Sequence, residues 1–441
     1  MENHLKQRYL CTDYAELAQR VSKACALSEE EQTIYEELIL SKTFIPAGNT
    51  LLAGACEVTP NCCVLGRLTD ENFEVMLELS RKLWQQRTGI GYDLSGLKDP
   101  ISALMELSAA NDAIDLGHRP KRGNMAVLEA SHPQIRQFIQ CKSRFSHLYN
   151  FNISVAIREE ISDDLLSFIA AHAWQTGDPG LVFLDRAECY GPVKADGLEP
   201  IVTCVPCGEQ FMHAYETCNL GSINLNSDLL LNKEKTALDY GRLRDAVRTA
   251  VTMMDRVVDL LEFPDDHIKQ VSLAARRIGL GVMGWADYLQ RQHIRYDSLA
   301  ALIMARTLSS SITRYAEERS RELAIKYGPC AFSREYRNLS LTCIAPTGGI
   351  TGLTANKGYG IEPFFEEAVQ YDYHTHINMQ AAWQSGMHNA VSKTINLPAS
   401  ATVQTVIDAY RHARKMGAKG ITVYRDGSRE QQPIALCPNC I

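Results

Sequence analysis

The chain has 441 residues, of which 45% are hydrophobic and 22% are charged, a composition that is ordinary for a soluble globular protein. It contains no apolar run of about 18 residues, so no membrane-spanning helix is expected. The formal net charge is −7 and no long basic run occurs, which argues against a nucleic-acid-binding protein. The first residues lack the apolar core of a signal peptide, so we expect a cytoplasmic location.

The 14 cysteines favour reactive or metal-binding thiols over a disulfide framework, which is rare in the cytoplasm. Most cysteines in such a chain nevertheless pack as small hydrophobic residues. We expect that plain packing role for Cys11, Cys25, Cys141, Cys189 and Cys330. Four further cysteines lie close to the motifs described below and are given no role: Cys56, Cys62, Cys204 and Cys343.

Residues 1–45 are predicted to be helical, because apolar residues recur there at helical spacing. Ser28, with Glu31 three residues later, has the spacing of a capping box. From about residue 46 onward, short apolar segments alternate with amphipathic helices, a pattern that is typical of an α/β barrel.

The longest predicted helices cover residues 72–87, 239–261 and 298–327. Strand-like segments are residues 151–156, 201–204, 341–345 and 420–423. The final residues, 428–441, are polar and contain two prolines, so we expect a flexible tail.

Three cysteines stand in separate motifs ahead of a C-terminal pair. Cys63 lies in NCCVL, Cys207 precedes Glu209 by two residues in VPCGE, and Cys218 begins CNLGSINL. The pair is Cys437 and Cys440, here called the tail dithiol, and it ends one residue before the C-terminus. Such a dithiol can reduce a disulfide inside a pocket by thiol–disulfide exchange. Zinc binding is the alternative, but the tail offers no second pair of ligands.

These motifs resemble the catalytic subunit of ribonucleotide reductases, and the resemblance recurs in the family's order along almost the whole chain. Further matching strings are residues 87–91 (RTGIG), 122–127 (RGNMAV), 151–156 (FNISVA), 276–284 (RRIGLGVMG), 345–350 (APTGGI), 360–363 (GIEP) and 421–427 (ITVYRDG). The family reduces ribonucleotides to 2′-deoxyribonucleotides by radical chemistry.

The resemblance implies a ten-stranded α/β barrel with a central finger loop. We expect a helical N-terminal region at 1–45, the catalytic barrel at 46–427 and a tail at 428–441 that carries the redox cysteines. A separate ATP-binding regulatory domain, which many relatives carry, is not expected.

By resemblance, Cys207 on the finger loop becomes the thiyl radical that takes the 3′ hydrogen, and Glu209 is the base at the 3′ hydroxyl. Cys63 and Cys218 supply the electrons and leave as a disulfide, which the tail dithiol then reduces. Taken alone, Cys63 has a plainer interpretation as a core residue. The family usually has asparagine where this chain has Val205, and valine cannot form that residue's hydrogen bonds. Either another polar residue, such as Asn49 or Asn219, replaces it, or the pocket tolerates the loss.

Two further sets of site residues follow from the resemblance. The substrate and phosphate set is Asn49, Thr50, Ala345, Pro346, Thr347, Gly348, Gly349, Ile350 and Thr351. The effector set, for a deoxynucleoside triphosphate such as dTTP at a homodimer contact, is Asp70, Arg119, Lys121 and Arg122. Residues 345–351 are here called the phosphate loop, and the alternative for them is a plain strand-to-helix turn. The alternative for Arg119, Lys121 and Arg122 is a solvated basic turn.

The initiating radical has to come from outside the chain, because no flavin, iron–sulfur, cobalamin or metal motif is visible. The resemblance implies a ferritin-like small subunit with a dinuclear metal centre, or adenosylcobalamin. The string around Tyr424, the candidate radical relay, looks more like the cobalamin-dependent members. The chain is short for the segments that cover a cobalamin, however, so the small subunit is slightly preferred. A thioredoxin- or glutaredoxin-type reductant is also expected. The competing classes are another barrel-type radical enzyme and a zinc-binding redox protein.

Overall fold

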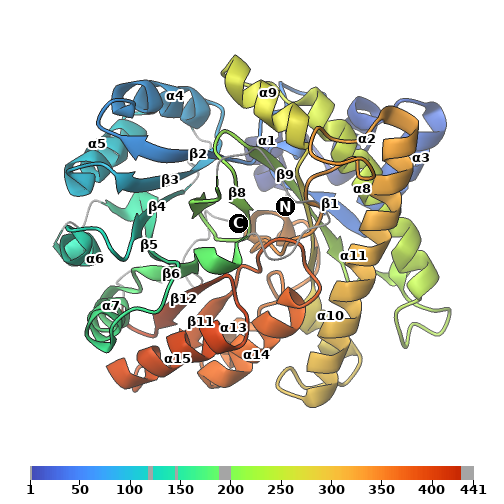
Figure 1. Ribbon diagram of the computed structural model, residues 1–441. Helices are drawn as coiled ribbons and strands as arrows, with labels where there is room; N and C mark the ends of the chain where they lie inside the picture. The colour runs from blue at the N-terminus through green and yellow to red at the C-terminus, as the bar shows by residue number, and fades with distance from the viewer. Residues whose placement is uncertain (1, 118–122, 145–147, 188–199, 429–441) are drawn as a thin grey trace.

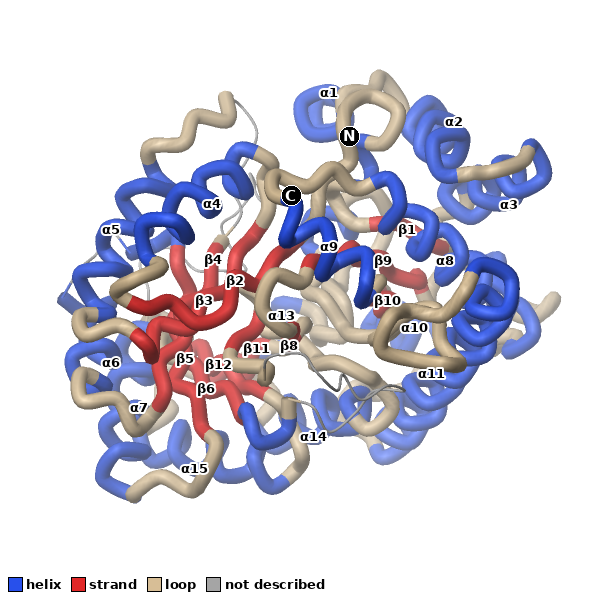
Figure 2. The backbone as a smooth tube through the Cα atoms, turned by 45° about the horizontal axis from the view of Figure 1, so that its top comes forward, coloured by secondary structure: helices blue, strands red, loops and turns tan. Residues whose placement is uncertain are grey.

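The computed structural model describes residues 2–117, 123–144, 148–187 and 200–428. Their centre is a ten-stranded sheet with the order β1-β9-β2-β3-β4-β5-β6-β12-β11, in which β10 also pairs with β9. Helices lie around the outside of the strands (Figure 2). No helix in these ranges is both long and apolar enough to cross a membrane.

The first half of the sheet is a run of five parallel strands joined by helices (Figure 1). The strands are β2 (Cys62–Thr69), β3 (Gly89–Gly96), β4 (Asn124–Glu129), β5 (Phe151–Ile157) and β6 (Gly180–Phe183). The helices between them are α4 (Phe73–Gln85), α5 (Pro100–Asp112), α6 (Ile135–Arg144) and α7 (Asp163–Thr176). Apolar side chains from both layers form one continuous core between this half of the sheet and its helices.

The second half runs antiparallel to the first at both junctions, where β9 pairs with β2 and β12 pairs with β6. Its strands are β9 (Thr217–Asn224), β10 (Ile278–Met283), β11 (Thr394–Leu397) and β12 (Gly420–Arg425), with the short β1 (Phe44–Pro46) on β9. Its helices are α8 (Tyr240–Leu260), α9 (Asp266–Ala275), α10 (Trp285–Arg291), α11 (Leu299–Tyr327), α12 (Gly348–Thr351), α13 (Phe365–Ala368), α14 (Tyr373–Gln384) and α15 (Val403–Lys415).

The sheet closes on itself through a segment that is not a regular strand. Thr342 bridges to Leu280 of β10, and Ile344 bridges to Val391, just before β11. The strand predicted at 341–345 is therefore wrong as a regular strand, although the segment takes a strand's place in the ring. The predicted α/β barrel fold is confirmed, and the three long predicted helices are found as α4, α8 and α11.

Three helices precede the barrel: α1 (Glu2–Tyr9), α2 (Tyr14–Cys25) and α3 (Glu29–Leu40). The side chain of Ser28 caps α3 by accepting a hydrogen bond from the backbone N–H of Glu31. The Glu31 carboxylate accepts from Leu27 N–H instead of closing the predicted box at Ser28. Leu5 and Tyr9 are buried in the core beneath the second half of the barrel, so α1 packs against the barrel.

A hairpin enters the ring between the two halves. Its strands are β7 (Thr203–Cys204) and β8 (Phe211–Met212). Of the strand predicted at 201–204, only the last two residues are in a strand. The Thr203 hydroxyl donates to the Tyr92 carbonyl at 3.1 Å. Asn389 holds the other arm through Phe211 N–H at 2.8 Å and the Gln210 side chain at 2.7 Å. This hairpin is the expected finger loop.

The finger loop passes so close to β3 that no side chain fits between them. A Cβ atom on Gly91 would lie 2.1 Å from the carbonyl oxygen of Cys204. A Cβ on Gly89 would lie 3.0 Å from the Pro206 ring. The glycines of the RTGIG string therefore let the backbone of the finger loop lie directly against the wall of the barrel.

Candidate active site

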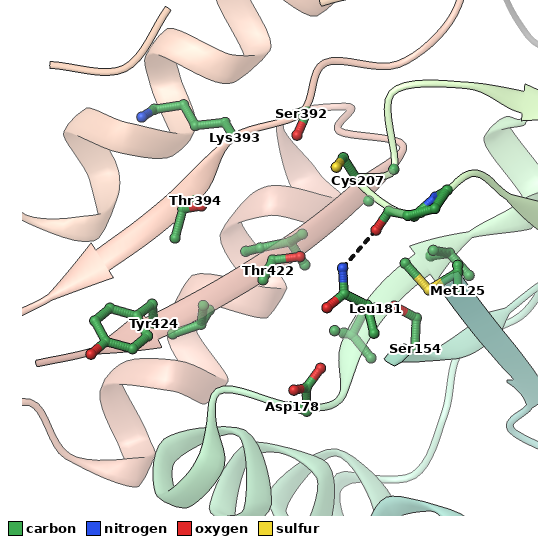
Figure 3. Close-up of a pocket in the computed structure, with 18 of the residues that line it drawn as sticks. Met125, Ser154, Asp178, Leu181, Cys207, Ser392, Lys393, Thr394, Thr422 and Tyr424 are labelled. Carbon is green, nitrogen blue, oxygen red and sulfur yellow. Dashed lines mark hydrogen bonds between the residues drawn. The ribbon is translucent and has the colours of Figure 1, made fainter. Parts of the chain in front are cut away.

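Cys207 lies at the tip of the finger loop. The turn closes with Gly208 N–H donating to the Val205 carbonyl at 2.9 Å, and Gly208 has a positive φ of 74°, which favours glycine. Asn152 of β5 donates to the Pro206 carbonyl at 2.8 Å and fixes the tip against the first half of the barrel (Figure 3). Among the described residues, the Cys207 side chain is exposed.

Two cavities meet at this tip, and Cys207 lines both of them. One has a volume of about 310 Å³ and contains the predicted phosphate loop, and we call it the phosphate-loop cavity. The other has a volume of about 340 Å³ and contains Tyr424, and we call it the tyrosine cavity. Cys207 therefore lies at the boundary of two cavities inside the barrel.

The phosphate-loop cavity brings together several of the predicted site residues. Glu209 lines it together with six residues of the predicted loop: Ala345, Pro346, Thr347, Gly348, Gly349 and Ile350. The Thr351 hydroxyl lies 2.9 Å from that of Thr347, behind the loop. Asn49 and Thr50 do not line the cavity, and their neighbours Ala47 and Gly48 line it instead.

The thiol that faces Cys218 is Cys62, and Cys63 lies on the other side of β2. Cys62 is directly opposite Cys218 in the antiparallel ladder, so both side chains point into the barrel. Cys62 and Cys218 share one interior cluster, whereas Cys63 is fully buried in the outer core under the helices. The expectation that Cys63 meets Cys218 is therefore not what the structure shows, because neighbouring residues of a strand point to opposite faces.

A third thiol lies in the same interior cluster. Cys343 is fully buried with Cys62 and Cys218. A Cβ atom on Gly279 would lie 2.8 Å from its sulfur, so Cys343 occupies the space left by a glycine of β10. Burial raises the pKa of both Cys218 and Cys343 well above the ordinary value of a thiol, so both are held protonated at neutral pH.

Glu209 is buried in the finger loop next to Cys207. Burial raises the pKa of its carboxyl to about 7. Among the described residues, its Oε2 atom has no hydrogen-bond partner. A carboxyl with these properties can give or take a proton at neutral pH.

Asn49 and Asn219, the two candidates to replace the family's asparagine, have other hydrogen-bond partners among the described residues. Val205 is buried in the interior cluster. The Asn49 amide donates to Thr59 at 3.0 Å and to the Pro60 carbonyl at 2.7 Å, and the Asn219 amide donates to the Met254 carbonyl at 3.2 Å. Neither asparagine bonds Glu209, so the expected replacement is wrong for both.

The tyrosine cavity is lined by the ends of β5, β6, β11 and β12. Tyr424 and Thr422 reach it from β12, Asp178 from the turn before β6, and Ser154 from β5 (Figure 3). Lys393 extends away from Cys207 and forms a buried ion pair with Glu362 of the predicted GIEP string. Glu362 also accepts from Thr394 N–H at 2.8 Å, so it ties the start of β11 to the wall of the barrel.

The remaining predicted site residues lie away from the cavities or outside the described residues. Asp70 follows β2 and forms a surface ion pair of 3.3 Å with Lys98. Arg119, Lys121, Arg122 and the tail dithiol lie outside the described residues. In the part of the chain that is described, no group of three or more His, Cys, Asp or Glu side chains could hold a metal ion.

Comparison with known proteins agrees with this geometry. The family "Ribonucleotide reductase, barrel domain" matches residues 155–338 and 360–424. The vitamin B12-dependent ribonucleoside-diphosphate reductase of Thermoplasma acidophilum is 31% identical over 91% of this chain and 66% of its own length. The enzyme of the same name from Mycobacterium tuberculosis is 30% identical over 98% of this chain and 80% of its own length.

A more distant relative is the vitamin B12-dependent ribonucleotide reductase of Rhodopirellula baltica, 23% identical over 83% of this chain and 52% of its own length. The family match covers more than half of the chain and includes the part of the ring from β6 to β12. The resemblance found in the sequence is thereby confirmed, and the chain belongs to the ribonucleotide reductase family.

Proposed function

We propose that this chain reduces ribonucleotides to 2′-deoxyribonucleotides, with the substrate in the phosphate-loop cavity and Cys207 as the radical-bearing residue. The observation that carries the proposal is the position of Cys207 between two cavities. A thiol in this place can lose its hydrogen atom on the side of the tyrosine cavity and act on a substrate in the other. The names of two relatives favour ribonucleoside diphosphates as substrates.

The chemistry assigns one task to each interior residue. The Cys207 thiyl takes the 3′ hydrogen and returns a hydrogen at the end of the cycle, while Glu209 takes the proton of the 3′ hydroxyl. The 2′ hydroxyl leaves as water. Two thiols supply two electrons and two protons and become a disulfide, so ribonucleotide and dithiol give deoxyribonucleotide, disulfide and water.

The pair that best fits the reducing role is Cys62 with Cys218. The two residues are opposite each other on β2 and β9, and Cys62 lines the cavity. A disulfide needs Cβ atoms about 3.5–4.5 Å apart, and directly opposite residues of antiparallel strands come close to that spacing. The tail dithiol remains the proposed electron donor to this pair, supplied in turn by a thioredoxin- or glutaredoxin-type protein.

The relatives' names favour adenosylcobalamin as the radical source. The slight preference for a small subunit, which rested on chain length, gains no support from them. The tyrosine cavity fits the adenosyl part of the cofactor, since its volume is that of a small-ligand site and Ser154, Asp178 and Thr422 offer hydrogen-bonding groups. When bound, adenosylcobalamin supplies a carbon-centred radical, and Cys207 offers the thiol hydrogen at the boundary of that cavity.

Tyr424 lines the same cavity and is 7% exposed. With a radical source in the cavity itself, the proposed task of Tyr424 is to shape the wall, and a relay role belongs to the small-subunit alternative. The effector site at Asp70, Arg119, Lys121 and Arg122 and the homodimer remain proposals that rest on the resemblance.

Incubating the chain with CDP and dithiothreitol should give dCDP only when adenosylcobalamin is added. Binding should also change the visible absorption spectrum of the cobalamin, which reports the cofactor independently of turnover. Product formation that needs no cobalamin but requires a second, metal-containing protein would contradict the proposed radical source.

Replacing Cys62 by serine should abolish formation of dCDP by the pre-reduced enzyme, because one of the two reducing thiols is gone. Cys63→Ser is the matched control, since its side chain lies in the outer core, and it should keep the single turnover. Peptide mapping after one turnover of a variant with Cys437→Ser and Cys440→Ser, which cannot pass the disulfide to the tail, should find the Cys62–Cys218 disulfide. Loss of product in the Cys63 variant with retention in the Cys62 variant would reverse the assignment.

The pH dependence of kcat/KM should report the ionisation of Glu209, because only the carboxylate can accept the proton of the 3′ hydroxyl. With a pKa of about 7, kcat/KM should be low at pH 6, where the carboxyl is protonated, and should rise to its full value by about pH 8. Glu209→Gln should lower kcat/KM by roughly 10²–10⁴-fold, the usual contribution of a general base, and remove this limb.

The stability of the protein provides an independent check on the same carboxyl. Its folded-state pKa is raised, so the unfolded chain loses the proton at lower pH and the folded state loses stability as pH rises toward 7. Glu209→Gln should therefore flatten this part of the unfolding profile.

An unchanged rise in kcat/KM between pH 6 and pH 8 in the Glu209→Gln variant would assign the kinetic limb to another group.

A further inference from the structure

The last turn of α1 lies against the phosphate loop, although the two are about 340 residues apart in the chain. The Tyr9 hydroxyl donates to the Gly349 carbonyl at 2.9 Å. A Cβ atom on Gly349 would lie 2.9 Å from Nη2 of Arg8, so the guanidinium lies directly over this glycine. Any side chain at position 349 would displace the guanidinium from the loop.

Arg8 and Tyr9 both line the phosphate-loop cavity. Arg8 is the one positively charged side chain among the described residues that line it, and Glu209 is the one carboxylate. The chain as a whole carries a net charge of −7, so it offers little general attraction to an anionic nucleotide. A local cation beside the phosphate loop supplies that attraction where the phosphates would lie.

The backbone around Arg8 is fixed by the core and by a second arginine. Tyr9 is 1% exposed and Leu5 is 2% exposed, both within the large core of the second half of the barrel. Arg20 of α2 donates from Nη2 to the carbonyls of Tyr9 at 2.8 Å and Leu51 at 2.9 Å. The end of α1 is thereby held to α2 and to the segment after β1, so Arg8 is presented from a rigid base.

We propose that Arg8 binds the terminal phosphate of the ribonucleotide, so that the N-terminal helix completes the substrate site of the barrel. This inference rests on the proposed function, because it takes the phosphate-loop cavity to be the substrate site. A guanidinium has a positive charge and a planar fork of donors that matches two phosphate oxygens. Backbone N–H groups of the loop and the Arg8 side chain then hold the same phosphate from two sides.

The proposal makes the contribution of Arg8 depend on the number of phosphates. A nucleoside has no phosphate that could reach the guanidinium. A diphosphate has a terminal phosphate that reaches it with its full negative charge. Removing Arg8 should therefore weaken binding of the diphosphate and leave the ribose and base contacts unchanged. A purely structural role for Arg8 would weaken binding of the nucleoside and of the diphosphate by the same factor.

The test compares Arg8→Gln with Lys6→Gln, which removes the same charge from an exposed position on the same helix. Equilibrium dialysis with cytidine, CMP and CDP measures binding without turnover. Loss of a charge-assisted hydrogen bond predicts a roughly 10–100-fold higher Kd for CDP in Arg8→Gln. Binding of cytidine should be unchanged, and Lys6→Gln should match the wild type. Arg8→Lys should recover part of the affinity, because it restores the charge without the planar fork.

Two results would overturn the role of Arg8. One is an equal loss of affinity for cytidine, CMP and CDP, which would make Arg8 a structural support of the loop. The other is unchanged CDP binding in Arg8→Gln. Failure of the proposed function itself would look different, since the wild-type protein would then bind CDP no better than cytidine.

Discussion

The close contact between the finger loop and β3 is the constraint on which the rest of the site depends. Gly91 has no side chain, and the carbonyl of Cys204 occupies the place where a Cβ would be. Asn389 and Thr203 then fix both arms of the hairpin by hydrogen bonds to the ring. These contacts place one thiol, Cys207, at the boundary of two cavities, and both the substrate and the radical source are assigned relative to that thiol.

The interior of the barrel combines thiols and a carboxyl in a way that an ordinary core does not. Burial holds Cys218 and Cys343 in the protonated form and raises the pKa of Glu209 to about 7. Protonated thiols are suited to giving hydrogen atoms, and a carboxyl near neutrality is suited to moving a proton. The low-polarity environment thus prepares both kinds of group for the proposed reduction, and the buried Arg277–Glu216 ion pair of 2.9 Å anchors the start of the strand that carries Cys218.

Much of the fold could be predicted because it depends on local patterns. Helices α4, α8 and α11 follow apolar residues at helical spacing, and the finger loop follows from the family resemblance. The inward orientation of Cys62 was missed because the sequence does not distinguish between two adjacent cysteines on one strand. Only the pairing of β2 with β9 shows which of the two faces inward. Arg8 was missed for a different reason: no spacing rule connects a helix at the start of the chain with a loop near residue 349.

In the proposed reaction, Cys207 carries the radical that acts on the nucleotide. The most direct measurement compares wild-type protein with Cys207→Ser in dCDP formation from CDP, with the binding of CDP measured on the same samples. The serine variant should bind CDP with nearly the wild-type Kd and form no dCDP, because a hydroxyl does not give an accessible radical. Formation of dCDP by the variant at more than a few per cent of the wild-type rate would show that another residue carries the radical.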